Sequence, residues 1–155
     1  MPSEIERQYL VADERWREEA DAGTSIVQGY LAADPERAVR VRIRDGDATL
    51  NLKGATDGAS RVEFEYDLPA DEAREILDDL ALRPLIEKRR HLVERDGYTW
   101  EIDVFTGANA GLVLAEVEVG DEQEVPPLPE WVGEDVTGDS RYYNASLVQR
   151  PFGEW

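Results

Sequence analysis

Apolar and charged residues alternate over several short stretches of this chain. The clearest stretch is 37–44, where valine or isoleucine occupies positions 39, 41 and 43 and arginine occupies the positions between them. Side chains of a β-strand point alternately to its two faces, so a period of two predicts a strand with one apolar and one charged face. The same reasoning predicts eight strands, at residues 4–11, 24–32, 37–44, 48–53, 61–68, 85–95, 98–105 and 112–119.

Short turn sequences separate several of the predicted strands. Asp45-Gly46, Asp57-Gly58 and Asp96-Gly97 each lie between two strands, and Asp34-Pro35 turns the chain before the third strand. Aspartate and glycine tolerate the positive φ angles of type I′ turns, which join antiparallel strands into hairpins. The turns therefore predict an antiparallel meander.

Residues 71–82 break the alternation, because their apolar residues recur three or four positions apart, as on one face of a helix. Asp71 and Glu72 would lie in the first turn, where negative charge favours the helix dipole. Shorter helices are predicted at 15–20 and at 144–148.

An antiparallel meander of eight strands closes into a barrel with a narrow interior. The predicted fold is therefore α+β: a single domain, residues 1–155, built on a closed eight-stranded antiparallel β-barrel with a few flanking helices. Prolines at positions 126, 127 and 129 end the regular structure, and the tail after them is expected to cover one end of the barrel.

The amino-acid composition limits the partners and the kinds of metal site that the protein can have. The chain has 17 basic and 35 acidic residues and a net charge of −18, which disfavours nucleic acid and anionic membranes as partners and would also suit a high-salt cytoplasm. It has no cysteine and one histidine, His91, so thiolate and multi-histidine metal sites are excluded. His91 lies on the strand face opposite Lys88 and Arg90, so we expect it to pack outside the barrel. With no apolar leader and no apolar run of membrane length, the protein is expected to be cytoplasmic.

The charged faces of the predicted strands separate by sign. One interpretation is a solvated outer face, as on most half-buried sheets. The other is a barrel with a charged interior and apolar faces packed outside, because a solvated face would mix its charges strand by strand. The pattern alone leaves both open. The cationic faces carry Arg40, Arg42, Lys53, Lys88 and Arg90, and the anionic faces carry Glu4, Glu6, Glu63, Glu65, Glu101, Asp103, Glu116 and Glu118.

An interior with both clusters would suit a polyanion bound together with divalent cations. The planar fork of arginine donates two parallel hydrogen bonds to phosphate, and lysine acts as a point charge. Carboxylates without soft ligands select Mg²⁺ or Mn²⁺ over zinc or copper. The expected ligand on that interpretation is a polyanion that arrives as its metal complex, and the residues do not distinguish a monomer from a homodimer.

The chain resembles the CYTH superfamily, the triphosphate tunnel metalloenzymes, over nearly its whole length. Its opening Glu4-Ile5-Glu6-Arg7-Gln8 looks like the family's N-terminal ExExK signature, and the short bacterial inorganic triphosphatases are the most similar members. Further family motifs follow in order: Gln28-Gly29-Tyr30-Leu31, Val39-Arg40-Val41-Arg42, Leu50-Asn51-Leu52-Lys53, Glu63-Phe64-Glu65, Glu87-Lys88-Arg89-Arg90, Glu101-Ile102-Asp103, Ala115-Glu116-Val117-Glu118 and Arg141-Tyr142-Tyr143-Asn144.

The resemblance implies metal-dependent hydrolysis of inorganic tripolyphosphate to pyrophosphate and phosphate inside the barrel. It implies a catalytic group of Lys53, Lys88, Glu63 and Glu65. Phosphate would be bound by Arg40, Arg42, Lys53, Lys88 and Arg90. Arg141 in the tail is a further candidate for phosphate if it reaches the tunnel, and its alternative role is to anchor the tail. One Mg²⁺ or Mn²⁺ would be held by Glu4, Glu6, Glu116 and Glu118, and a second by Glu63, Glu65 and Asp103.

One position departs from the family pattern: the lysine of the first motif is Gln8 here. Losing a charge-assisted contact in a buried site costs roughly 1.5–3 kcal/mol, or about one to two decades of rate or affinity. Alternatives are therefore hydrolysis of thiamine triphosphate or nucleoside triphosphates, cyclisation of ATP by an adenylyl cyclase, and binding of triphosphate or polyphosphate with weakened catalysis.

Overall fold

A computed structural model describes residues 3–34, 36–55, 57 and 59–155. The strands are β1 (Ser3–Val11), β2 (Thr24–Ala33), β3 (Arg37–Arg44), β4 (Asp47–Gly54), β5 (Ser60–Leu68), β6 (Ile86–Arg95), β7 (Tyr98–Thr106), β8 (Val113–Glu118) and β9 (Val132–Asp135). The α-helices are α1 (Ala70–Asp79) and α2 (Asn144–Gln149). Short 3₁₀ helices are η1 (Arg15–Glu18), η2 (Gly107–Asn109), η3 (Ser140–Tyr142) and η4 (Phe152–Glu154).

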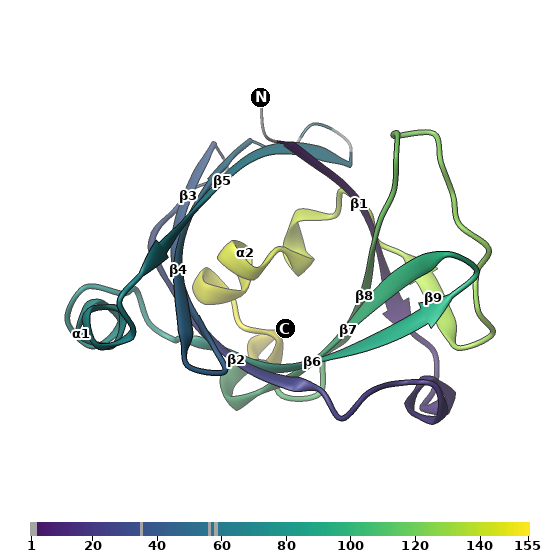
Figure 1. The fold of residues 1–155 in the computed structure, drawn as a ribbon, viewed down its shortest axis with the longest axis horizontal. Coiled ribbons are helices and arrows are strands. Elements are labelled where there is room, and N and C mark those ends of the chain that lie inside the picture. The colour runs from purple at the N-terminus through teal and green to yellow at the C-terminus, as the bar shows by residue number, and fades with distance from the viewer. Residues whose placement is uncertain (1–2, 35, 56, 58) are drawn as a thin grey trace.

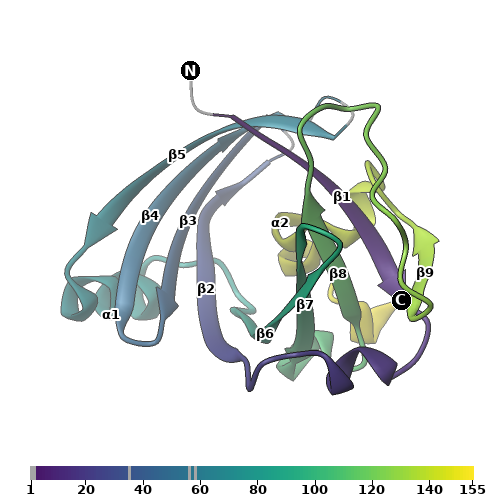
Figure 2. The same ribbon diagram turned by 45° about the vertical axis from the view of Figure 1, so that its right-hand side comes forward.

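Strands β1 to β8 form a closed antiparallel barrel, as the alternation predicts (Figure 1). The strand order is β5-β4-β3-β2-β6-β7-β8-β1, and the ring closes where β1 pairs with β5. Glu4 lies opposite Arg61 in this closing pair. The prediction that regular structure ends at the prolines is wrong in one respect, because β9 adds a ninth strand on the outer side of β1 (Figure 2).

Two of the predicted hairpin turns have the backbone that type I′ turns require. Asp45 and Gly46 have φ angles of 49° and 83°, and Asp96 and Gly97 have 54° and 80°. The predicted turns at Asp34-Pro35 and Asp57-Gly58 each include a residue outside the described part of the chain. The confirmed turns set the register that places every second side chain of β3, β4, β6 and β7 in the interior.

Helix α1 ends earlier than predicted, at Asp79 rather than residue 82. The guanidinium of Arg83 donates to the carbonyl oxygens of Leu77 and Asp78, which satisfies two acceptors at this helix end. The predicted helix at 15–20 is the 3₁₀ turn η1, and the predicted helix at 144–148 is confirmed as α2.

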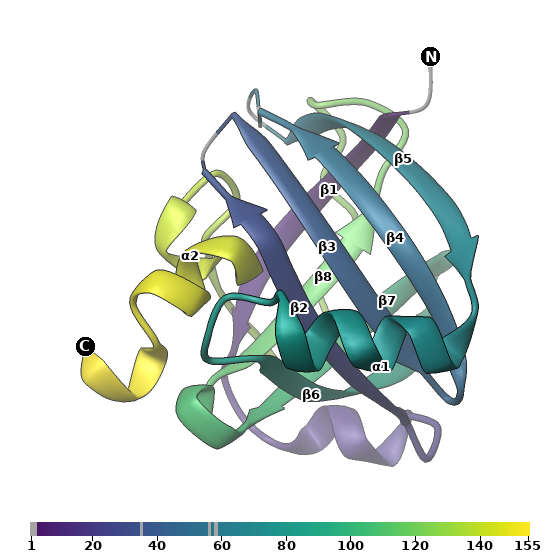
Figure 3. The same cartoon turned by 90° about the vertical axis from the view of Figure 1, so that its left-hand side faces the viewer.

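Much of the apolar surface of the strands faces outward and is covered by helices and loops. Helix α1 lies across β3 and β4, where Ala73 and Leu77 pack against Val41 and Ala48 (Figure 3). On the other side of the barrel, Trp16, Trp100 and Trp131 are fully buried against the outer faces of the strands. These three tryptophans therefore pack the outside of the barrel, and the charged side chains of the strands face its interior.

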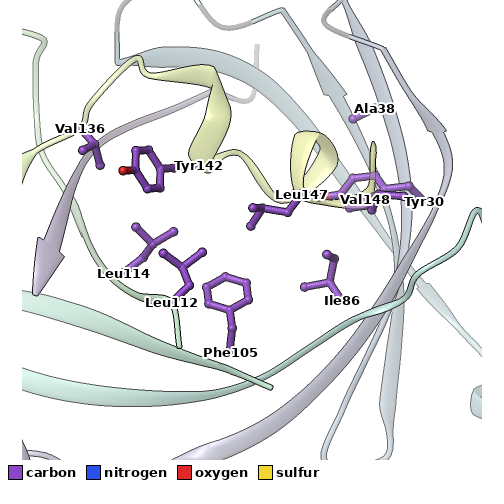
Figure 4. Close-up of a cluster of buried hydrophobic side chains, with 10 residues drawn as sticks. All are labelled: Tyr30, Ala38, Ile86, Phe105, Leu112, Leu114, Val136, Tyr142, Leu147 and Val148. Carbon is purple, nitrogen blue, oxygen red and sulfur yellow. The ribbon is translucent and has the colours of Figure 1, made fainter. Parts of the chain in front are cut away.

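The C-terminal segment closes one end of the barrel (Figures 1 and 3). Figure 4 shows this end, where Leu147 and Val148 of α2 and Tyr142 of η3 pack with interior residues such as Phe105 and Leu114. The expectation that the tail covers one end is confirmed. Beyond this apolar layer the interior becomes charged.

Among the described residues, no helix is long and apolar enough to cross a membrane.

Candidate active site: a charged tunnel

A cavity of about 290 Å³ runs through the charged part of the barrel. It decides between the two interpretations of the charged strand faces, since both signs line one interior space rather than a solvated outer surface. Of the site residues predicted from the sequence, the cavity is lined by Glu4, Glu6, Arg40, Arg42, Lys53, Glu63, Glu65, Lys88, Arg90, Glu116 and Glu118. Asp103 and Arg141 are not among the residues that line it.

Two arginines of β3 form the cationic wall. Arg40 is 5% exposed, and its buried Nε has no hydrogen-bond partner among the described residues. Its nearest carboxylate, that of Glu63, is 4.0 Å away. Burial, with the like charges of Arg40 and Arg90, lowers the pKa of Arg42 to about 9. Buried guanidinium groups with so little counter-charge fit a site for an anion.

Lys53 joins the cationic wall to the acidic one. Its Nζ lies 2.9 Å from Oε1 of Glu4 and 2.9 Å from Oε2 of Glu63. Burial raises the pKa of Glu63, but Lys53 and Arg40 outweigh it and hold this pKa below its usual value. Glu63 is therefore ionised at neutral pH and is available as a metal ligand or as an acceptor for water.

Asp103 lies opposite Arg90 in the pairing of β6 with β7 and is enclosed by cationic side chains. It is fully buried behind the cavity wall, where its carboxylate lies 2.7 Å from Lys88 Nζ and accepts two hydrogen bonds from Arg90 at 2.8 and 2.9 Å. Burial raises its pKa, but the charges of Lys88 and Arg90 hold that pKa well below its usual range. With its oxygens occupied by two cations, Asp103 fits an anchor for the side chains of Lys88 and Arg90 better than a metal ligand.

Gln28 and Asn144 belong to the site, although no charge or periodicity in the sequence distinguished them. Oδ1 of Asn144, in α2, accepts hydrogen bonds from Lys88 Nζ at 2.8 Å and from Gln28 Nε2 at 2.7 Å. Gln28 in turn accepts from Arg42 Nε at 2.8 Å. A continuous network thus links Arg42 to Lys88 through the C-terminal helix. Burial lowers the pKa of Lys88 to about 8, so its ammonium form still dominates at neutral pH.

Replacing Asn144 by alanine would remove the shared acceptor of Lys88 and Gln28. Because a buried donor left unpaired costs about 1–3 kcal/mol, we expect the free energy of unfolding to fall by that amount, measured by urea denaturation. Ser146→Ala, a substitution on the same helix, should change it by no more than about 0.5 kcal/mol. Equal stability of Asn144→Ala and the wild type would show that the network is not maintained in solution.

The acidic wall lies on β1 and β8. Glu6 pairs with Glu118 and Gln8 with Glu116 across these strands. Burial and the neighbouring carboxylates of Glu116 and Glu4 raise the pKa of Glu6 well above its usual value. Gln8 is buried, and its amide donates to Glu116 at 3.2 Å.

This wall fits a divalent cation in its donor chemistry, since its oxygens are all from carboxylates and a cation would relieve their repulsion. In the described part of the chain, no three acidic or histidine side chains converge on one point. Lys53 and Gln8 instead occupy two of the four carboxylates, those of Glu4 and Glu116.

Arg141 is not brought to the tunnel. It is exposed on η3, and its guanidinium lies 2.7 Å from Asp139, two residues earlier in the chain. This local ion pair explains why the predicted reach from the tail is absent. His91 packs outside the barrel as expected, with its ring 5.1 Å from that of Trp16 and its Nδ1 3.1 Å from the carbonyl oxygen of Asp21.

The model of the CYTH domain matches residues 2–152 of the chain. The chain belongs to the CYTH family. This CYTH chain is 43% identical over 152 residues to an inorganic triphosphatase of Acetivibrio thermocellus, covering 98% of this chain and 97% of that protein. An inorganic triphosphatase of Nitrosomonas europaea is 34% identical over 153 residues, with 94% and 97% covered.

A solved structure confirms the fold of the CYTH chain. The crystal structure of an inorganic triphosphatase, 32% identical, superposes with a TM-score of 0.68 and covers 96% of this chain and 95% of that one. The predicted resemblance to this family and the predicted closed barrel are both confirmed. The family implies a divalent metal, which agrees with the donor chemistry of the acidic wall.

Proposed function

We propose that this CYTH chain hydrolyses inorganic triphosphate to pyrophosphate and phosphate inside its tunnel. The observation that carries the proposal is the division of charge within one cavity, with Arg40 and Arg42 on one wall and Glu6 and Glu116 on another. The first pair offers buried guanidinium groups to phosphate, and the second offers oxygens to a cation. The relatives named as inorganic triphosphatases, similar over their full length, support this choice of substrate.

The cationic side chains bind the phosphate oxygens and neutralise the charge that spreads over them in the transition state. Phosphoryl transfer needs mainly positioning and electrostatic stabilisation from a protein. We assign this work to Arg40, Arg42, Lys53, Lys88 and Arg90. The last two are held in place by Asp103, and Arg42 and Lys88 are linked by Gln28 and Asn144.

Glu63 and Glu65 are assigned to the attacking water. The water oxygen attacks the terminal phosphorus while a proton of the water passes to the carboxylate of Glu63. The bond from that phosphorus to the bridging oxygen breaks, and pyrophosphate leaves with the bridging oxygen. Glu63 is kept ionised by Lys53 and Arg40, and Glu65 is oriented by Asn51, whose amide donates to it at 2.8 Å. Both carboxylates line the cavity from β5 and can accept hydrogen bonds from water.

Mg²⁺ or Mn²⁺ would be held by Glu4, Glu6, Glu116 and Glu118, with Glu63 and Glu65 available to a second ion. Bound there, a divalent cation supplies charge neutralisation and orients the phosphate chain. Asp103 and Arg141 are left out of the metal and substrate sets, because their charges are already paired elsewhere.

The direct test is phosphate release from tripolyphosphate by the purified protein with Mg²⁺ or Mn²⁺, and with EDTA as the control. Chromatography of the products from ATP separates hydrolysis from cyclisation, and thiamine triphosphate is compared in the same assay. Release of phosphate from tripolyphosphate only when metal is present supports the proposal. Tight calorimetric binding of tripolyphosphate without turnover would instead favour a binding module.

Binding of Mn²⁺ is expected to be weaker in mildly acidic buffer than at neutral pH. Carboxylates ordinarily ionise near pH 4.3, but the pKa of Glu6 is raised by burial and by Glu116 and Glu4, so its proton competes with the metal at the lower pH. Titration calorimetry at both pH values checks this. Glu6→Gln replaces the carboxyl group by an amide that does not titrate in this pH range. This variant should show little of the difference in Mn²⁺ affinity between the two pH values. Equal affinity of the wild type at both pH values would contradict it.

A further inference from the structure

Arg61, on β5, lies at the closed end of the tunnel and has no role assigned so far. It lines the main cavity of about 290 Å³ and also two smaller cavities, of about 40 and 350 Å³, beside the C-terminal segment. Tyr143 lines the same three spaces. Arg61 and Tyr143 therefore border all three spaces, at the place where the tunnel meets the tail.

The guanidinium of Arg61 is only partly satisfied by the protein. One terminal nitrogen donates to the carbonyl oxygen of Gly54 at 3.1 Å. Its Nε is buried and has no hydrogen-bond partner among the described residues. Among the described residues, Arg61 also forms no ion pair, although the protein has 35 acidic residues. A buried arginine nitrogen without a partner fits a bound anion.

The residues around Arg61 indicate a role for its positive charge. The 40 Å³ cavity beside it is also lined by Glu6 and Gln8, and Arg61 is the one cation among its described lining residues. Gln8 brings no charge to this end of the tunnel, and its amide is already directed to Glu116. A phosphate placed here would meet the carboxylate of Glu6 with no other cation from the cavity wall to balance it.

We propose that Arg61 is a further substrate-binding residue, which holds the phosphate nearest the closed end of the tunnel and supplies the positive charge that Gln8 does not. The ligand chemistry is a phosphate oxygen that accepts from the guanidinium. This inference rests on the proposed triphosphatase function.

The test is steady-state hydrolysis of tripolyphosphate by Arg61→Gln. Loss of one charge-assisted contact predicts a KM raised about ten- to a hundredfold, with kcat changed less. Arg61→Lys, which keeps the charge, should recover part of the loss. In the Arg61→Gln background, Gln8→Lys should lower KM again by about tenfold, because it returns a cation to the same cavity. Arg74→Gln, on the exposed face of α1, is the matched control and should leave KM unchanged.

A purely structural role would give a different pattern. If Arg61 served only to bind the carbonyl of Gly54, Arg61→Gln would lower the melting temperature but leave KM within about twofold of the wild type, and Gln8→Lys would rescue nothing. Either result overturns the inference. Should the wild type fail to hydrolyse tripolyphosphate, the proposed function fails separately. The affinities of the wild type and Arg61→Gln for tripolyphosphate, measured by calorimetry, still decide the role of Arg61.

Discussion

Asp103→Asn is expected to lower the free energy of unfolding by about 3–5 kcal/mol, the usual cost of removing one partner from a buried ion pair. Asp103 is fully buried and is the shared counter-charge of Lys88 and Arg90, whose side chains are 1% and 7% exposed. Asparagine keeps the shape of the side chain but leaves two buried cations facing a neutral amide. Urea denaturation at neutral pH measures the loss.

Glu101→Gln is the matched control for this substitution. Glu101 also bonds Arg90, at 3.1 Å, but its side chain is 34% exposed, so water can replace the lost charge. We expect a loss of no more than about 1 kcal/mol. If Asp103→Asn were instead as stable as the wild type and bound Mn²⁺ more weakly, the role of Asp103 as a metal ligand would be supported and its role as an anchor would fail.

The stabilisation of the folded protein by Asp103 changes with pH in a definite direction. The pKa of Asp103 in the folded protein is held below the value near 3.9 expected in the unfolded chain, so the folded state favours the ionised form. The stabilisation is therefore fully present above about pH 4 and is lost as the pH falls toward the folded-state pKa. The difference in stability between the wild type and Asp103→Asn should shrink under acid.

The barrel could be predicted from the sequence because a period of two is a local signal. Alternation sorts residues such as Arg40 and Val41 onto opposite faces whatever their partners, and the Asp-Gly turns join neighbouring strands in register. Strand β9 could not be predicted because it lacks this local signal. Its four residues, Val132–Asp135, show no alternation, and β9 pairs with β1 rather than with a neighbour in sequence.

The pairing of charges inside the tunnel could not be predicted, because it depends on closure of the ring. Asp103 shares its predicted strand face with Glu101, yet one is fully buried between two cations and the other is a third exposed. Gln28 and Asn144 carry no charge, and only the docking of α2 on the barrel end brings Asn144 to Lys88. Whether Arg141 reaches the tunnel could not be decided from the sequence, because its position depends on a local ion pair with Asp139.

Lys53→Ala is expected to reduce kcat/KM for tripolyphosphate by at least about a hundredfold. Its ammonium is the link between the walls of the tunnel, 2.9 Å from both Glu4 and Glu63. Removing it deletes a charge-assisted contact to phosphate, worth about one to two decades. It also takes the nearest counter-charge from both carboxylates and leaves Glu63 with the more distant Arg40, so the two carboxylates repel the incoming triphosphate more strongly. The two effects act in the same direction, and the loss should exceed that of a single hydrogen bond.

Three further variants test whether the charge of Lys53 and the position of the site are responsible for the loss. Lys53→Arg keeps the charge and should recover part of the activity, whereas Arg74→Ala, on the exposed face of α1, should leave kcat/KM unchanged. Glu6→Ala removes a proposed metal ligand and should be as inactive as Lys53→Ala, but its activity should depend on metal concentration more steeply. Because Lys53 and Glu6 line the same cavity from β4 and β1, hydrolysis that survives both substitutions would place the reaction outside the tunnel. Loss in both variants, with the melting temperatures retained, would locate the reaction between the two walls.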